Sequence, residues 1–182
     1  MVLNLKIIFG GDGSVGKTSY LRRYTTGEFI ELSKLTIGTG FFSKKIKVKH
    51  PKSGLPIECS LLLWDFGGQE RFRHILNEYV LGALGGLIFF DVSRYSSFVH
   101  VSEWADLLRI NDEDPNRPMP LIIVGNKVDL DLFEVDSTEI EEMKNKIKAI
   151  DYIPCSCKTG LNIDLIIEKM VEAILLHQEK ID

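Results

Sequence analysis

The stretch GGDGSVGKTS, from Gly10 to Ser19, constrains the fold of this chain more than any other. It joins an apolar run, LKIIF, to a stretch with helical spacing, YLRRY, and it contains four glycines and one lysine. A plain connection between a strand and a helix needs only a glycine or two, where φ must be positive. The surplus of glycine therefore predicts a strand, a loop with a specific task, and a helix.

The loop matches the pattern GxxxxGK[ST] at Gly11, Gly16, Lys17 and Thr18. Small residues let consecutive backbone N–H groups surround phosphate oxygens, and the following helix N-terminus adds its positive end. Lys17 would neutralise β- and γ-phosphate oxygens, and the Thr18 hydroxyl would bind Mg²⁺. A phosphate site is favoured over a flexible structural turn. The residues expected to hold the nucleotide here are Asp12, Gly13, Ser14, Val15, Gly16, Lys17, Thr18 and Ser19.

Strand and helix patterns alternate along the whole chain, which indicates an α/β, doubly wound sheet with flanking helices. Strands are expected at 3–9, 41–49, 57–65, 87–91 and 121–126 and before 156, and helices at 17–24, 97–110, after 136 and from 163. The turn PKSGLP makes the second and third strands a hairpin, so the six-stranded sheet should be mostly parallel with one antiparallel edge strand. Lys45, Lys47 and Lys49 on that edge favour a solvated surface over a partner surface.

Length and composition fit one domain, residues 1–182, because 182 residues with 45% hydrophobic content can bury a core. The formal net charge of −4 offers no global attraction to nucleic acid, so an anionic ligand needs a local site. The three cysteines, Cys59, Cys155 and Cys157, indicate a reducing, cytoplasmic setting. No membrane anchor is visible in this chain, so any membrane association would be peripheral, through a partner or a tail beyond residue 182.

Two residue types that often carry chemistry are expected to be incidental. Trp104 lies on an apolar helical stripe, which favours core packing over a ligand role. The four histidines have no spacing suited to a metal site or a proton relay, so surface or incidental roles are expected for His50, His74, His100 and His177.

Three further polar motifs follow strands, at the edge of an open α/β sheet where ligands bind. WDFGGQE ends the third strand. It places Asp65 where a carboxylate can hold a Mg²⁺-bound water and Gly68 where an N–H can meet a γ-phosphate, with Gln69 next in the chain. NKVD, residues 126–129, ends the fifth strand, and SCK, residues 156–158, follows the sixth. A rim of polar loops without a ligand is the disfavoured alternative.

NKVD and SCK together predict selectivity for guanine. Guanine presents two parallel N–H donors on one edge, which the carboxylate of Asp129 can accept, whereas adenine has no such edge. The O6 acceptor would meet the backbone N–H of Cys157, the stems of two lysines would cover the base faces, and Asn126 would tie the loops together. The expected base-binding residues are Asn126, Lys127, Asp129, Ser156, Cys157 and Lys158.

With these motifs, the chain resembles the small GTPases of the Ras superfamily over its whole length. The motifs are GDGSVGKTS, TIG, WDFGGQERF, NKVD and SCK; TIG and WDxxGQERF are most similar to the Rab and Ras branches. The resemblance implies that Thr36 joins Thr18 and, through water, Asp65 around Mg²⁺ when a γ-phosphate is present. It also implies that Phe29 packs near the guanine. The two switches would be residues 30–38 and 67–78, and Gly67 is an Arf-like variation.

The function that the resemblance implies is a monomeric, GTP-binding switch that hydrolyses GTP slowly with Mg²⁺. Gln69 would orient the attacking water, and Lys17 would stabilise charge. Because residues 27–35 contain no arginine, we expect the stabilising arginine from an activating (GAP) partner, with Arg71 as the alternative in this chain. Exchange proteins (GEF) and effector proteins are the other expected partners, and no nucleic acid is.

Two other functions stay open. The first is a GTP-binding scaffold or subunit with negligible turnover, which Gln69 and Gly13 disfavour because such a protein needs no water-orienting amide. The second is an ATP-dependent kinase on a phosphate loop, which NKVD disfavours because this motif suits guanine.

Overall fold

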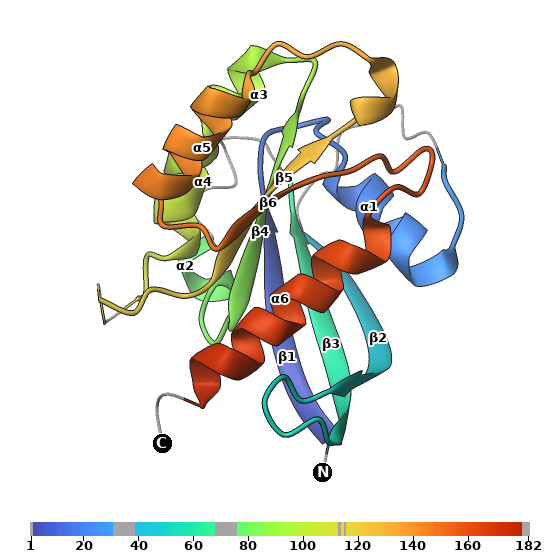
Figure 1. The fold of residues 1–182 in the computed structure, drawn as a ribbon, viewed down its shortest axis with the longest axis vertical. Helices are drawn as coiled ribbons and strands as arrows, with labels where there is room; N and C mark the ends of the chain where they lie inside the picture. Colours follow the sequence, from blue (N-terminus) through green and yellow to red (C-terminus); the bar gives the residue numbers. More distant parts are fainter. Residues whose placement is uncertain (1, 31–38, 68–75, 113, 115, 180–182) are drawn as a thin grey trace.

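The structure is a computed structural model, and it describes residues 2–30, 39–67, 76–112, 114 and 116–179. Its strands form one six-stranded sheet in the order β2-β3-β1-β4-β5-β6 (Figure 1). The strands are β1 Val2–Gly10, β2 Thr39–Lys49, β3 Pro56–Phe66, β4 Gly85–Asp91, β5 Leu121–Asn126 and β6 Asp151–Pro154. β2 pairs antiparallel with β3, and the other neighbouring strands pair in parallel. The predicted sheet is confirmed, including its antiparallel edge strand.

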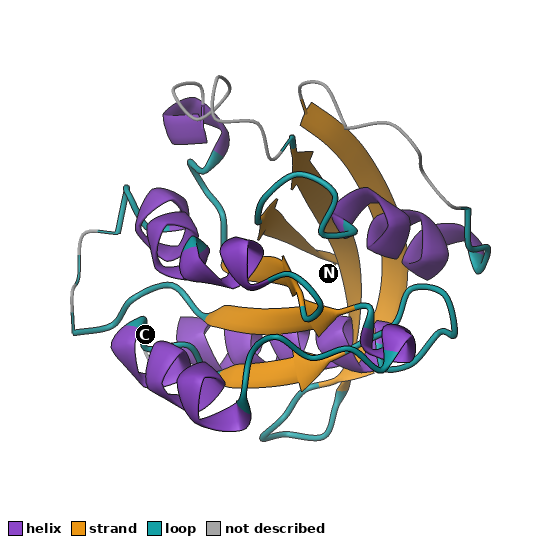
Figure 2. Cartoon of the chain, turned by 90° about the horizontal axis from the view of Figure 1, so that it is seen from above, coloured by secondary structure: helices purple, strands orange, loops and turns teal. Residues whose placement is uncertain are grey.

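Helices cover both faces of the sheet, as the view from above shows (Figure 2). They are α1 Lys17–Thr26, α2 Leu76–Tyr79, α3 Tyr95–Val99, α4 Val101–Leu108, α5 Ser137–Lys146 and α6 Ile163–Gln178, with a 3₁₀ turn at Val128–Leu130. Side chains of α1 and α6 form one buried cluster with alternate residues of β1 such as Phe9, and side chains of α3, α4 and α5 form the other with Ile8. The central parallel strands are therefore buried on both faces, which explains their nearly continuous apolar sequences.

One helix boundary differs from the sequence prediction. The periodicity predicts a single helix over 97–110, but the structure has two, α3 and α4, separated at His100. The ring of His100 contacts Asp12 in the phosphate loop, and Trp104, one turn further along, reaches the same carboxylate. The break therefore accompanies a tertiary contact, which apolar spacing alone does not reveal.

Two smaller sequence predictions, the capping box at Asp136 and the core position of Trp104, are confirmed. Asp136 and Glu139 form the predicted capping box at the start of α5. Trp104 is buried in the core, and the three cysteines are buried and free. Even α6, with 16 residues, falls short of what a helix needs to cross a bilayer, and the same holds for the other helices that the structure describes.

Candidate functional site

The polar motifs meet at one edge of the sheet, where the parallel strands end. β1 leads into the phosphate loop, and β3 and β5 bring Asp65 and Asn126 to the same edge. The chain after β6 adds residues 156–158. Figure 2 looks down on this edge. Because ligands of open α/β sheets bind at the carboxyl ends of the strands, this edge is the candidate site.

The phosphate loop requires glycine at two of its motif positions. Gly11 has φ 131° and Gly16 has φ 103°, which L-residues with side chains rarely adopt. A Cβ on Gly11 would lie 2.3 Å from the carbonyl oxygen of Phe89, and one on Gly16 would lie 2.1 Å from Asn126 Nδ2. The loop is therefore pressed against β4 and β5, and this close approach explains why glycine occupies these places.

Lys17 is the buried cation of the loop, with 6% of the residue exposed. Its Nζ donates to the carbonyl oxygens of Gly11 at 2.5 Å and Asp12 at 2.8 Å. Burial lowers the pKa of Lys17 to about 8, against the opposing effect of the carboxylates of Asp65 and Asp12. An ammonium group that is buried among neutral carbonyls gains from an anion, so this position suits phosphate.

Thr18 and Asp65 provide oxygen ligands of the kind that Mg²⁺ prefers. The Thr18 hydroxyl donates to Asp65 Oδ2. Asp65 is fully buried, its Oδ1 has no hydrogen-bond partner among the described residues, and burial raises the pKa of its carboxyl group. A buried carboxylate oxygen without a partner is unfavourable unless a ligand engages it. The residues present therefore fit a hard cation bound directly or through water.

Asn126 connects the phosphate loop to the predicted base-binding loops. Its Nδ2 donates to Val15 O at 2.9 Å, and its Oδ1 accepts from Cys157 N at 3.3 Å. This is the tying role that the sequence predicts for Asn126. The Cys157 N–H, predicted to meet a purine O6, points to the Asn126 oxygen in this structure, so a bound base would have to share that donor.

The carboxylate of Asp129 is oriented by a neighbouring motif. Ser156 Oγ donates to Asp129 Oδ1 at 2.6 Å and itself accepts from Thr159 N at 3.1 Å. Lys127 Nζ contacts Asp91 Oδ2 at 2.6 Å. Burial alone would raise the pKa of Asp91, but hydrogen bonds from Lys127 and Ser93 lower it overall. Asp129 and Lys127 of NKVD are thus held in place by Ser156, which follows β6, and by Asp91, at the end of β4.

For the other predicted site residues, the structure gives only burial or backbone conformation, or does not describe them. Phe29 is half-buried and packs against the cluster formed with α1 and α6, and Lys158 is exposed. Ser14, with φ 63°, and Gly13 form the outer turn of the phosphate loop. Thr36, Gly68, Gln69 and Arg71 lie outside the described residues, as do most of the two predicted switches.

Sequence reasoning missed three contacts on the phosphate loop. His100 Nδ1 lies 2.6 Å from Asp12 Oδ2, and Trp104 Nε1 donates to Asp12 Oδ1 at 2.9 Å. The expectation of a surface or incidental role for His100 is therefore incomplete: its side chain is 40% exposed, but it also contacts the phosphate loop. Arg94 Nη2 donates to Gly13 O at 2.7 Å. Arg94 lies three residues after the end of β4. Because ligands of open α/β sheets bind at the carboxyl ends of strands, this position was the sequence signal that could have indicated Arg94.

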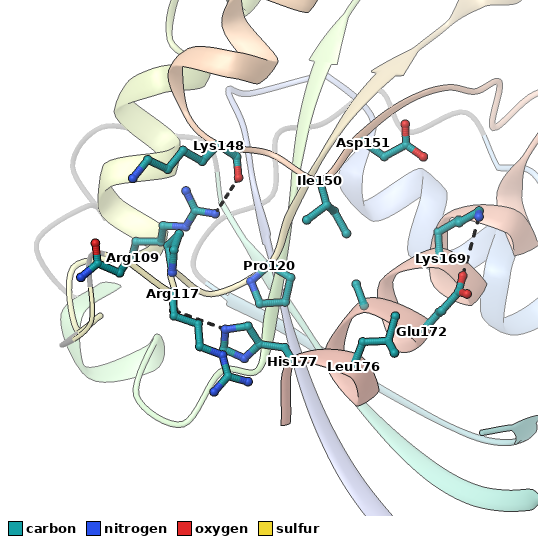
Figure 3. Close-up of a pocket in the computed structure, with 13 residues that line it drawn as sticks. Arg109, Arg117, Pro120, Lys148, Ile150, Asp151, Lys169, Glu172, Leu176 and His177 are labelled. Carbon is teal, nitrogen blue, oxygen red and sulfur yellow. Dashed lines mark hydrogen bonds and ion pairs between the residues drawn. The ribbon is translucent and has the colours of Figure 1, made fainter. Parts of the chain in front are cut away.

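A cavity of about 710 Å³ lies at the opposite end of the sheet (Figure 3). Pro120, which precedes β5, and Ile150, which precedes β6, line it together with Arg117, Leu176 and His177. The lining residues that the structure describes include none of the motif residues. This hollow is therefore separate from the candidate site.

The site defines a class of protein: a nucleotide-binding domain in which a glycine-rich loop between a strand and a helix carries the phosphate-binding lysine. The family model described as "Ras family" matches residues 6–176. The chain belongs to the Ras family, as a Rab-like small GTPase of the Ras superfamily.

Several Rab proteins are similar to nearly the whole chain. Ras-related protein Rab-27B of Homo sapiens is 33% identical over 183 residues, which cover 97% of this chain and 82% of that protein. Ras-related protein Rab-11C of Dictyostelium discoideum is 34% identical, covering 93% of this chain and 71% of that protein. Ras-related protein Rab7 of Drosophila melanogaster is 32% identical, covering 88% and 75%. These similarities support a GTPase switch in general.

Proposed function

We propose that residues 1–182 form one G domain that binds GTP and GDP with Mg²⁺ and acts as a switch. The observation that carries this proposal is the double contact of Asn126, which joins the phosphate loop at Val15 to the base-side loop at Cys157. One ligand that spans both loops would have to carry phosphates and a base. A guanine nucleotide fits both ends.

On the phosphate side, the Lys17 ammonium would donate to β- and γ-phosphate oxygens in place of the carbonyl oxygens of Gly11 and Asp12. Gly13, Ser14, Val15 and Gly16 would present backbone N–H groups to the same oxygens. Thr18 and, through water, Asp65 would hold Mg²⁺, with Thr36 as a further ligand when a γ-phosphate is present. When bound, the metal ion would neutralise charge on the phosphates.

On the base side, both carboxylate oxygens of Asp129 would accept from the guanine edge, while Ser156 also donates to one of them. The stems of Lys127 and Lys158 would cover the base faces, and Phe29 would pack near the ring. A carboxylate that is already oriented discriminates well, because an analogue without matching donors leaves it unpaired.

For hydrolysis, we propose that Gln69 orients water and that Gly68 meets the γ-phosphate, with Lys17 stabilising the developing charge. Turnover by the protein alone is slow, and an activating protein supplies a further positive charge. Exchange proteins release GDP, and effectors bind the GTP state. The protein acts as a monomer in the cytoplasm, peripheral to membranes through a partner or a tail.

Binding titrations of the full chain with GTP, GDP and ATP test this proposal, with Lys17→Met as the control that removes the phosphate-binding charge. Tight binding of both guanine nucleotides, weak binding of ATP, and loss of binding in the control are expected. Equal affinity for ATP would contradict the base-site assignment. A single-turnover measurement in the presence of Mg²⁺ separates the switch from the alternative scaffold, which would retain GTP unhydrolysed.

A further inference from the structure

Arg94 lies between β4 and α3, with its side chain against the phosphate loop. Its backbone N–H donates to Asp91 O at 3.0 Å, and its carbonyl oxygen accepts from Ser97 Oγ at 2.7 Å. The side chain then spans a sequence separation of 81 residues, and its Nη2 donates to Gly13 O at 2.7 Å. Arg94 is thus anchored at its backbone and at the tip of its guanidinium group.

The guanidinium group retains hydrogen-bonding capacity at this position. Its Nε is buried and has no hydrogen-bond partner among the residues that the structure describes. Guanidinium carries five N–H donors in a fixed plane and stays charged at any physiological pH. A buried, charged donor group is unfavourable unless an acceptor, and best an anion, engages it.

Arg94 and Lys17 place two positive charges around the same loop. The Lys17 ammonium is held inside the loop by Gly11 O and Asp12 O, and Arg94 holds the outside at Gly13 O. Two positive charges beside one loop repel each other, and a bound polyphosphate would offset that repulsion.

We propose that Arg94 is a positioning residue of the phosphate site: its guanidinium holds the Gly13 carbonyl and keeps a permanent positive charge beside the loop, which strengthens the binding of nucleoside di- and triphosphates. The inference rests on the proposed function. It adds a residue on the β4 side of the site, which the five sequence motifs do not include. The charge supports the ground-state binding of GDP as well as GTP, since the loop holds the phosphates that both nucleotides share.

Two variants separate the charge from the hydrogen bond. Arg94→Gln keeps an N–H donor for Gly13 O but removes the charge, and Arg94→Lys keeps both a donor and the charge. Arg117→Gln is the matched control, because Arg117 lines the cavity at the other end of the sheet (Figure 3). Circular dichroism and the melting temperature of the nucleotide-free proteins report whether each variant folds.

The measurement is the dissociation constant for GDP and for a non-hydrolysable GTP analogue, at about 0.05 M and about 0.5 M KCl. Arg94→Gln is expected to bind both ligands about tenfold more weakly at low salt, with a smaller difference at high salt. Arg94→Lys should stay within about threefold of the wild type, because the charge is retained. Arg117→Gln should bind as the wild type does.

Wild-type affinity of Arg94→Gln at both salt concentrations would overturn the inference, as would a loss in Arg94→Lys as large as in Arg94→Gln. The first result would make Arg94 dispensable for binding, and the second would reduce it to a structural contact specific to arginine. Failure of the wild type to bind either ligand would instead contradict the proposed function, and the inference would fall with it.

Discussion

The two halves of the candidate site differ in how far the protein satisfies its own polar groups. In the phosphate half, Asp65 Oδ1 and Arg94 Nε are buried without a partner among the described residues. In the base half, Asp129 and Lys127 each have a side-chain partner at 2.6 Å. The phosphate half suits a strongly charged ligand and a cation, which would engage these two polar atoms. The second is already ordered, which suits discrimination between neutral bases.

The largest expected effect concerns the base half. Asp129→Asn replaces one of the two carboxylate oxygens with an N–H₂ group. One of the two guanine N–H donors would then face another donor. GTP affinity should fall by about 10⁴, as expected for a polar mismatch in a built site, whereas xanthosine triphosphate should be accepted. Competition titrations with both nucleotides measure the change. Unchanged GTP affinity would show that Asp129 does not bind the guanine base.

The next largest effect concerns catalysis on the phosphate side. Gln69→Leu removes the amide proposed to orient water while roughly preserving volume, so GTP binding should persist and single-turnover hydrolysis should slow by roughly 10². Arg71→Ala, measured in parallel, should change little if the stabilising arginine comes from a partner. A fast wild type that Arg71→Ala slows strongly would instead show an arginine within the chain.

The pH dependence of stability tests whether burial lowers the pKa of Lys17 in the folded protein. Burial lowers the pKa of Lys17 to about 8 in the folded protein, from its ordinary value of 10.5, which the unfolded chain keeps. Above pH 8 the unfolded chain therefore holds more protons, and the unfolding free energy should rise with pH. From pH 8 to about pH 10 the gain is at most about 2.5 kcal/mol.

The check is urea unfolding of nucleotide-free wild type and Lys17→Met across this pH range. Tyrosines and other lysines titrate there as well, so the difference between the two proteins is the quantity to compare. Parallel curves for wild type and Lys17→Met would mean that the folded protein does not depress the pKa of Lys17.

The smallest expected effect comes from removing the side chain of Asn126, which connects the phosphate half to the base half. Asn126→Ala removes the donor to Val15 O and the acceptor for Cys157 N, two groups that are buried at this joint. The unfolding free energy should fall by about 2 kcal/mol. GDP and phosphate-only ligands such as pyrophosphate should both bind more weakly; weakening of GDP alone would show that Asn126 serves only the base half.

Much of the fold was predictable from local patterns. The alternation of strands and helices, the antiparallel edge strand beside PKSGLP and the capping box at Asp136 are all confirmed. The phosphate loop was also recognisable from its local pattern of glycines and Lys17, although the close approach of Gly11 to Phe89 and of Gly16 to Asn126 is a tertiary contact. The roles of the motif residues toward a nucleotide stay predictions.

The sequence by itself determined the fold class and the motifs, because periodicity, glycine placement and strand ends depend on neighbours along the chain. The tertiary structure decided which distant side chains meet. His100 and Trp104 lie 88 and 92 residues from the Asp12 carboxylate that they contact, and Arg94 lies 81 residues from Gly13. The end of β4 marks Arg94 as a candidate, but no local pattern encodes which distant residues these three side chains contact. Such contacts arise only when the packed sheet brings the segments after β1 and β4 together.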